Sequence, residues 1–182
     1  ASVCACPTTE RNLGDGVVPA DLLFREGVSV SLGTDSQAQI DLLEDARALE
    51  YHLRLQKLER NVLAPSDDAT SAGENDGADT QLSGLAARLF ACATAGGARS
   101  IGFAGGELEP GRPADLFTVD LDDPSIAGAG EDDLLAAITF SLARTAVRDV
   151  VVGGRTIVED GRHAGAAEIV ERFAALQRRL WS

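Results

Sequence analysis

The chain has 182 residues, enough for one domain or two small ones. Hydrophobic residues make up 45% of the sequence, so a packed core is possible and global disorder is not expected. The 16 Lys and Arg residues against 29 Asp and Glu give a formal net charge of −13, which argues against a nucleic-acid or anionic-membrane partner.

No apolar run approaches the roughly 18 residues that a membrane helix needs, and no basic stretch followed by an apolar one marks a secretory signal. The three cysteines (Cys4, Cys6 and Cys92) are too few and too scattered for a disulfide framework. We therefore expect a cytoplasmic protein. Methionine is absent, also at the first position, so we expect the chain to be the C-terminal piece of a longer protein.

Two short apolar runs near the start, residues 2–6 and 28–33, are predicted to be buried strands. Residues 19–27 between them predict a short helix that ends at a glycine. A strand, a helix and a strand within about thirty residues form a βαβ unit, so the two strands should be parallel. The long connection over residues 7–18 is predicted to be a loop, and loops at the carboxyl ends of strands commonly carry function.

Residues 40–60 predict the clearest helix, with Glu50 and Arg54 four residues apart in the stabilising order. Its apolar residues form one stripe at spacings of four, three and four: Leu42, Ala46, Leu49 and Leu53. Residues 64–80 hold five acids and no base, which predicts a mobile surface loop; they lack the spacing of a calcium-binding loop.

A second helix is predicted over residues 81–95, with Gly96 and Gly97 ending it. Its predicted inward residues are Leu82, Leu85, Leu89 and Phe90. The glycine-rich residues 96–111 lack the pattern of a phosphate-binding loop and are interpreted as turns.

The rest of the chain changes character. Strands are predicted at residues 115–119, 147–152 and 155–158, the last two joined by a hairpin turn at Gly153-Gly154. Helices are predicted at about 131–143 and 167–180. The order of elements favours a two-part architecture.

Asp35 directly follows the second predicted strand, in the segment Gly33-Thr34-Asp35-Ser36. A carboxylate at the C-terminal end of a barrel strand is typical of a metal-dependent hydrolase, where it can bind a divalent metal and accept a proton from water. The alternative is that Asp35 caps the helix that follows, since aspartate is a common N-cap residue.

Arg11, next to Glu10 in the loop after the first strand, can form a bidentate clamp on a carboxylate substrate or a plain surface salt bridge. His52 and His163 lack a ligand partner two or four residues away, so both are interpreted as structural or exposed. Cys4 and Cys6 should share one strand face as small buried hydrophobic residues. One aspartate cannot hold a catalytic zinc, which needs about three protein ligands, so further ligands must lie outside this chain.

Three stretches resemble the C-terminal part of the amidohydrolase superfamily. The strand that ends at Asp35 is similar to the eighth barrel strand with its metal-binding aspartate. Residues 93–116, A-T-x-x-G-A-x-x-I-G followed by G-R-P-A-D-L, are similar to the family's passage from the barrel into a small β-domain. Residues 150–161 are similar to the terminal hairpin of that domain.

Within the superfamily, residues 6–16, C-P-T-T-E-R-N-L-G-D-G, resemble the formimidoylglutamate deiminases. The resemblance implies hydrolysis of N-formimino-L-glutamate to N-formyl-L-glutamate and ammonia, in histidine breakdown. It also implies one zinc ion, a cytoplasmic homodimer, a small acidic amidine as substrate, and Asp35 as metal ligand and general base. Because that substrate is a dicarboxylate, Arg11 is a candidate contact.

The family layout gives an α/β fold: the last two βα units of a (β/α)8 barrel in residues 1–105, the C-terminal part of a small β-sandwich domain in 106–165, and a terminal helix in 166–182. The histidine ligands of the family have no counterpart here, so the isolated chain should bind zinc poorly and be inactive. Two alternatives stay open: a deaminase of purines or other cyclic amidines, and a non-catalytic fragment or assembly module.

Overall fold

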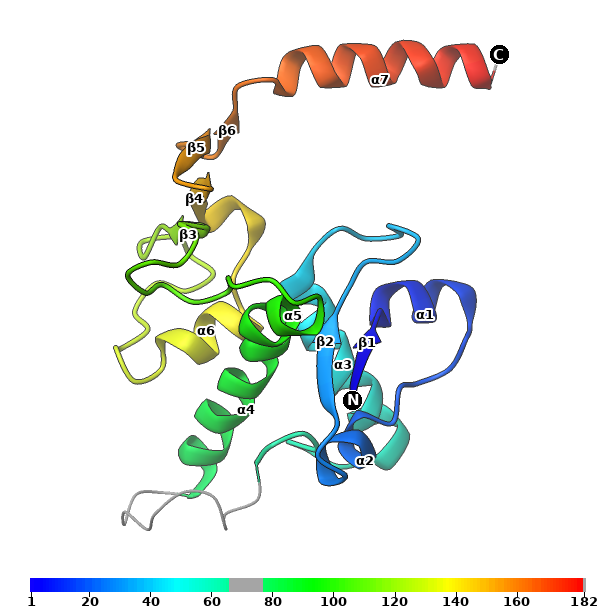
Figure 1. Cartoon of the computed structure of the whole chain (residues 1–182), viewed down its shortest axis with the longest axis vertical. Helices are drawn as coiled ribbons and strands as arrows, with labels where there is room; N and C mark the ends of the chain where they lie inside the picture. Colours follow the sequence, from blue (N-terminus) through cyan, green and yellow to red (C-terminus); the bar gives the residue numbers. More distant parts are fainter. Residues whose placement is uncertain (66–76, 182) are drawn as a thin grey trace.

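The computed structural model describes residues 1–65 and 77–181, and Figure 1 shows their arrangement. The elements, in chain order, are β1 (Ser2–Ala5), α1 (Pro7–Leu13), α2 (Ala20–Arg25), β2 (Ser29–Leu32), α3 (Leu42–Lys57), α4 (Gly77–Ala93), α5 (Ala95–Ser100), β3 (Leu116–Val119), α6 (Leu134–Phe140), the 3₁₀ helix η2 (Arg144–Ala146), β4 (Val147–Val152), β5 (Arg155–Glu159), β6 (Arg162–His163) and α7 (Ala166–Leu180). The fold is mixed α/β, as predicted.

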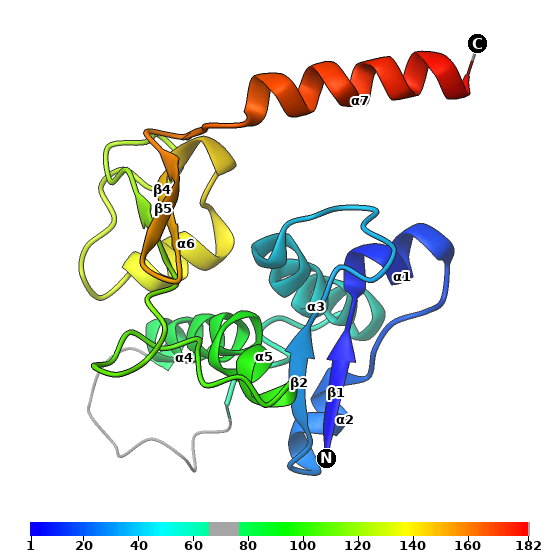
Figure 2. The same cartoon turned by 45° about the horizontal axis from the view of Figure 1, so that its top comes forward.

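The strands form two sheets. Strands β1 and β2 pair in parallel, with Ser2 opposite Ser29 and Ala5 opposite Leu32, which confirms the predicted βαβ unit. The second sheet has the order β3-β4-β5-β6 and is antiparallel throughout. In Figure 2 the arrowheads of β1 and β2 point the same way, toward α1 and toward the segment that follows β2. The polar segments that leave the two strands therefore emerge at one edge of the sheet.

Helix α3 packs its predicted stripe into the main core. Ala46, Leu49 and Leu53 are buried, whereas Leu42 in the first turn is 39% exposed and lies outside the core. The predicted pair of Glu50 and Arg54 is confirmed, with 2.7 Å between Arg54 Nε and Glu50 Oε1. Glu50 is wholly buried. Its carboxylate also accepts the backbone N–H groups of Val62 and Leu63 at 3.0 and 2.9 Å, and these bonds offset the cost of burying the charge.

Helix α4 begins at Gly77, so residues 77–80 are helical and the predicted loop over 64–80 is wrong for them. Residues 64–65 are neither helix nor strand, and residues 66–76 of that loop lie outside the described residues. Leu85 and Leu89 are buried in the core as predicted, whereas Leu82 is 37% exposed.

The helix that was predicted to end at Gly96-Gly97 ends earlier in the structure. Helix α4 ends at Ala93, and both glycines lie inside the short helix α5. A Cβ atom at Gly96 would lie 2.8 Å from the Ala91 carbonyl oxygen, so the glycine permits a close turn from one helix into the next. The interpretation of residues 96–111 as turns is therefore wrong over the part that α5 covers.

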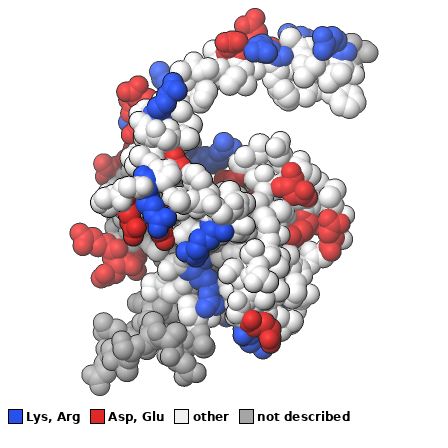
Figure 3. Space-filling model, viewed as in Figure 1, with Lys and Arg blue, Asp and Glu red and all other residues white. Residues whose placement is uncertain are grey.

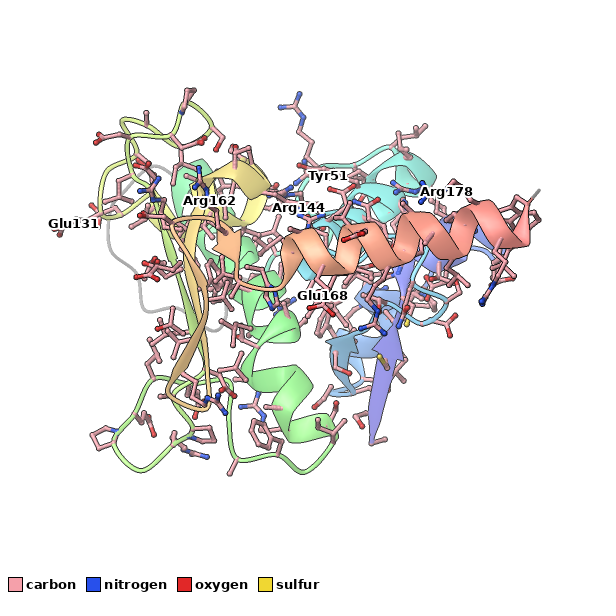
Figure 4. All side chains as sticks on the ribbon, turned by 90° about the horizontal axis from the view of Figure 1, so that it is seen from above. Tyr51, Glu131, Arg144, Arg162, Glu168 and Arg178 are labelled. Carbon is pink, nitrogen blue, oxygen red and sulfur yellow. The ribbon has the colours of Figure 1, made fainter. Side chains whose placement is uncertain are left out.

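Helix α7 stands clear of the rest of the molecule (Figures 1 and 2) and buries none of its residues. Figure 4, seen from above, labels Glu168 near its start and Arg178 near its end. In Figure 3 the charged side chains of α7 lie mainly on its outer side, and the side toward the body is largely uncharged. The exposed apolar residues of this segment are Ile169, Val170, Phe173, Leu176, Leu180 and Trp181. Within residues 1–65 and 77–181, no helix has the length and apolar character needed to cross a bilayer.

Candidate functional site

Asp35 lies three residues beyond the end of β2, exposed, in a tight turn over residues 34–37. The Gln37 N–H donates to the Thr34 carbonyl oxygen at 2.8 Å and closes this turn. The backbone φ of Asp35 is +42°, in the left-handed region that non-glycine residues rarely adopt. Such strained residues gather at functional sites, which makes this turn the centre of the candidate site.

The alternative role of Asp35 as a helix cap is not observed. The N-cap of α3 is Asp41, whose Oδ1 accepts the backbone N–H groups of Leu43 and Glu44, both at 3.1 Å. Asp35 is six residues upstream and separated from α3 by the turn. Its carboxylate is therefore not engaged in capping this helix.

The connection after β1 contains a helix, α1, where a loop was predicted over residues 7–18. Pro7 at the first helical position fits the fixed φ of proline, and the Cys6 N–H donates to Glu10 Oε1 at 2.8 Å. Gly14, at φ +77°, closes the helix in the left-handed conformation that glycine adopts without strain. Local capping thus forms a helix that apolar periodicity does not indicate.

Helix α1 is anchored on α3 through a buried carboxylate. The Thr8 N–H donates to Asp45 Oδ1 at 3.0 Å, and Asp45 is wholly buried. Burial raises the pKa of the Asp45 carboxyl above its ordinary value, and the bond from Thr8 opposes part of that rise. Asp45 was missed in the sequence, although an acid three residues after Leu42 and four before Leu49, on the apolar stripe, was a usable signal.

Thr9 joins α1 to the Asp35 turn. Its hydroxyl donates to the Thr34 carbonyl oxygen at 2.9 Å and lies 3.1 Å from the Ser36 hydroxyl oxygen. Thr9 is 1% exposed. The two segments that follow β1 and β2 therefore contact each other directly at the sheet edge. The motif over residues 6–16 contains Thr9, but nothing in the sequence pointed to its contact with residues 34–37.

Arg11 lies near the C-terminal end of α1 and points toward α3. One guanidinium nitrogen is 3.9 Å from a Glu44 carboxylate oxygen, another donates to Gln39 Oε1 at 3.5 Å, and the side chain is 51% exposed. These are long, solvent-exposed contacts that bind the guanidinium weakly. The structure thus shows Arg11 in a surface ion pair, with the group free to turn to another carboxylate.

The two histidines differ in their surroundings. His52 is half-buried on α3, and its pKa is lowered by burial and by the nearby charge of Arg11. His163 is exposed, and its Nδ1 accepts the Gly165 N–H at 3.0 Å. Within the described part of the chain, no group of three or more histidine, cysteine, aspartate or glutamate residues could hold a metal ion. The donor set present here, Asp35 alone, does not make a zinc site.

Cys4 and Cys6 point to the same side of β1, as predicted, because a Cβ atom at Gly33 would lie 2.9 and 3.4 Å from their sulfur atoms. The expectation that both are buried is wrong: Cys4 is exposed and Cys6 is half-buried. Burial, followed by the proximity of Cys4, Asp35 and Glu10, raises the pKa of the Cys6 thiol to about 11. Cys6 is therefore a neutral thiol beside the Asp35 turn.

A cavity of about 690 Å³ separates the end of β2 from the second sheet. Most of its lining is apolar and includes Leu32, Phe90, Phe103, Leu108 and Phe117. Asp35 does not line it. The cavity is therefore an apolar space that adjoins the parallel strands rather than part of the Asp35 site.

The chain is similar to known proteins over nearly its whole length. The profile of the amidohydrolase family matches residues 1–157. Formimidoylglutamate deiminase of Pseudomonas aeruginosa is 39% identical over 168 residues, which cover 92% of this chain and 34% of the relative. A 5-methylthioadenosine/S-adenosylhomocysteine deaminase of Natronomonas pharaonis is 33% identical over 161 residues, covering 87% and 32%.

Solved structures of similar proteins also match the fold of this chain. An amidohydrolase from Brucella melitensis matches with a TM-score of 0.78 and 32% identity, over 100% of this chain and 37% of its own. An adenosine deaminase from Xanthomonas campestris, with bound zinc, matches with a TM-score of 0.77 and 25% identity, over 98% and 37%. The chain thus spans about a third of the length of the curated relatives it matches.

Proposed function

The chain belongs to the amidohydrolase family, and on that basis we propose that it is the C-terminal part of a zinc-dependent formimidoylglutamate deiminase. The reaction is hydrolysis of N-formimino-L-glutamate to N-formyl-L-glutamate and ammonia, in the cytoplasm, as a step of histidine breakdown. The observation that carries the proposal is the meeting of the 6–16 segment and the Asp35 turn at one sheet edge, through Thr9. The 39% identity to a formimidoylglutamate deiminase supports this substrate.

The proposed architecture makes β1 and β2 the seventh and eighth strands of a (β/α)8 barrel, within residues 1–105. Residues 106–165 would be the C-terminal share of a small β-sandwich domain, and residues 166–182 a terminal helix. Support comes from the parallel pairing of β1 with β2 and from exposed apolar surfaces, the 690 Å³ cavity and the inner side of α7. Parallel sheets are normally covered on both faces. In a protein as long as the relatives, the other two thirds of the chain would cover these surfaces.

Asp35 is the proposed contribution of this chain to the metal site and to proton transfer. A catalytic zinc takes about three protein ligands, so the others would come from outside these 182 residues. As general base, Asp35 would accept a proton from the attacking water while the water oxygen bonds to the amidine carbon. The C–N bond to the terminal nitrogen then breaks, and that nitrogen leaves, protonated, as ammonia.

Arg11 is the proposed contact for a substrate carboxylate. The guanidinium can form two parallel hydrogen bonds with a carboxylate, and its present partners hold it at 3.9 and 3.5 Å only. The assembly is proposed to be a homodimer, as the family resemblance implies.

The test is ammonia release from N-formimino-L-glutamate by the complete encoded protein, wild type beside Asp35→Asn. We expect the substitution to lower kcat by on the order of 10²–10⁴-fold, the usual range for a lost general base, with the folded structure retained. Arg11→Gln should instead raise KM, and Glu44→Gln is its matched control. The 182-residue chain alone should release no ammonia.

A second candidate, a deaminase of purine nucleosides, is favoured by the identity to 5-methylthioadenosine/S-adenosylhomocysteine deaminases. A substrate panel decides between the two. A folded, zinc-loaded wild type that deaminates the nucleosides and leaves N-formimino-L-glutamate intact would refute the first proposal.

A further inference from the structure

The hydroxyl of Thr9 contacts both chain neighbours of Asp35. It donates to the carbonyl oxygen of Thr34 at 2.9 Å, so the 3.1 Å contact to Ser36 places the Ser36 hydroxyl as donor and Thr9 as acceptor. Both bonds come from one side chain that is 1% exposed. The residues on both sides of Asp35 are therefore held by a single hydroxyl group from another element of the chain, an arrangement called here the Thr9 bracket.

The turn that carries Asp35 needs such support. Asp35 and Gln37 have φ values of +42° and +57°, and neither is glycine. Backbone strain of this kind persists only where the surrounding structure fixes it. The Thr34 carbonyl accepts two hydrogen bonds, one from the Gln37 N–H that closes the turn and one from Thr9. Loss of the Thr9 bond removes the contact to this carbonyl that comes from outside the turn.

Thr9 is itself held firmly. The preceding residue donates its N–H to the buried carboxylate of Asp45, and the first turn of α1 is braced by the bond from the Cys6 N–H to Glu10. A side chain on a rigid, doubly anchored helix can fix the geometry of a neighbouring segment better than one on a free loop.

We propose that Thr9 is a positioning residue, whose hydroxyl holds the turn over residues 34–37 so that the Asp35 carboxylate is presented in one orientation. The role of Asp35 that Thr9 would serve rests on the proposed function. The two hydrogen bonds of Thr9 can be tested without any activity.

The test compares Thr9→Val, which keeps the side-chain shape and removes the hydroxyl, with Thr9→Ser, which keeps the hydroxyl. The matched control is Thr8→Val on the same helical turn, because among the described residues no hydrogen bond joins the buried Thr8 hydroxyl to the turn over residues 34–37. Amide hydrogen exchange of a peptide that contains Gln37, measured by mass spectrometry in the complete encoded protein, reports opening of the turn. We expect Thr9→Val to speed this exchange roughly fivefold or more, the equivalent of one lost hydrogen bond.

Thr9→Ser and Thr8→Val should leave Gln37 exchange close to wild type, and amides in the centre of α3 should be unchanged in all three. Should Thr9→Val not fold, Ser36→Ala at an exposed position removes the other half of the bracket and should also speed Gln37 exchange. Exchange that is unchanged in Thr9→Val, or raised equally by Thr8→Val, overturns the proposal. In the complete protein, Thr9→Val should lower kcat with KM nearly constant, and Thr9→Ser should restore it. A complete protein inactive on N-formimino-L-glutamate would refute the proposed function and leave the exchange result to decide the bracket.

Discussion

The carboxylate of Asp45 on α3 accepts the backbone N–H of Thr8 on α1 at 3.0 Å, across 37 residues of sequence. Asp45 is wholly buried. This bond fixes the start of α1, and with it the side chain of Thr9 that reaches the Asp35 turn.

Two substitutions of Asp45 should distinguish the contribution of its hydrogen bond to stability from that of its charge. Asp45→Ala leaves the Thr8 N–H unsatisfied, and we expect it to lower the free energy of unfolding by about 1–3 kcal/mol. Asp45→Asn keeps an acceptor without the charge and should stay within about 1 kcal/mol of wild type. Urea denaturation measures both, and equal losses in the two variants would contradict this account.

The same residue predicts a pH dependence. Because burial raises the pKa of Asp45 in the folded state, the folded protein binds its proton more tightly than the unfolded chain does. Its contribution to stability is therefore highest below the ordinary aspartate pKa of about 3.9 and falls as the pH rises through the folded value. The stability of Asp45→Asn relative to wild type should therefore increase as the pH rises above about 3.9, as urea denaturation at several pH values would show.

Asp21 predicts the opposite trend. Burial alone would raise its pKa, but the hydrogen bond and charge of Lys57, with help from Arg25, hold that pKa below its ordinary value. Its stabilising contribution is present above about pH 4 and is lost as the pH falls through the folded pKa. We expect Asp21→Asn to cost about 1 kcal/mol at pH 7 and much less below pH 3. Arg25→Gln, which changes the more exposed of the two partners, should cost only a few tenths of a kcal/mol. A cost that persists unchanged into acid would contradict the assignment.

The cysteines should differ in their reaction with iodoacetamide at about pH 8. Cys4 is exposed, whereas Cys92 is 4% exposed and burial raises the pKa of its thiol to about 11. We expect mass spectrometry to find Cys4 labelled and Cys92 unmodified in the folded chain, and all three cysteines labelled in urea. Rapid labelling of Cys92 without denaturant would show that the core around α4 opens readily.

Much of the fold could be predicted because it depends on local periodicity. The pairing of residues 2–6 with 28–33 and the hairpin at Gly153-Gly154 follow from short apolar runs with a helix or a two-glycine turn between them. Helix α1 could not be predicted, since its residues have no apolar period and its anchor is a carboxylate 37 residues away. The ends of the stripes, Leu42 and Leu82, were misplaced because helix periodicity continues beyond the core it faces.

The candidate site could likewise be predicted only in part. Asp35 could be singled out because it follows an apolar strand, but two aspartates lie within seven residues and the sequence does not distinguish the cap from the turn. The structure assigns the cap to Asp41, through its bonds to Leu43 and Glu44. Thr9 was missed because its role depends on a contact between segments 25 residues apart.

The two hydrogen bonds of Thr9 make α1 and the Asp35 turn one structural unit rather than two exchangeable parts. A protein engineer who grafts residues 6–14 from a relative with another substrate preference would also change the group that supports Thr34 and Ser36. Chimaeras that exchange both segments together should preserve the orientation of Asp35, whereas a graft of one segment alone leaves the Asp35 turn without its matching partner. Residues 6–14 and the turn over residues 34–37 are thus mechanically linked, and directed evolution of one segment must carry the other with it.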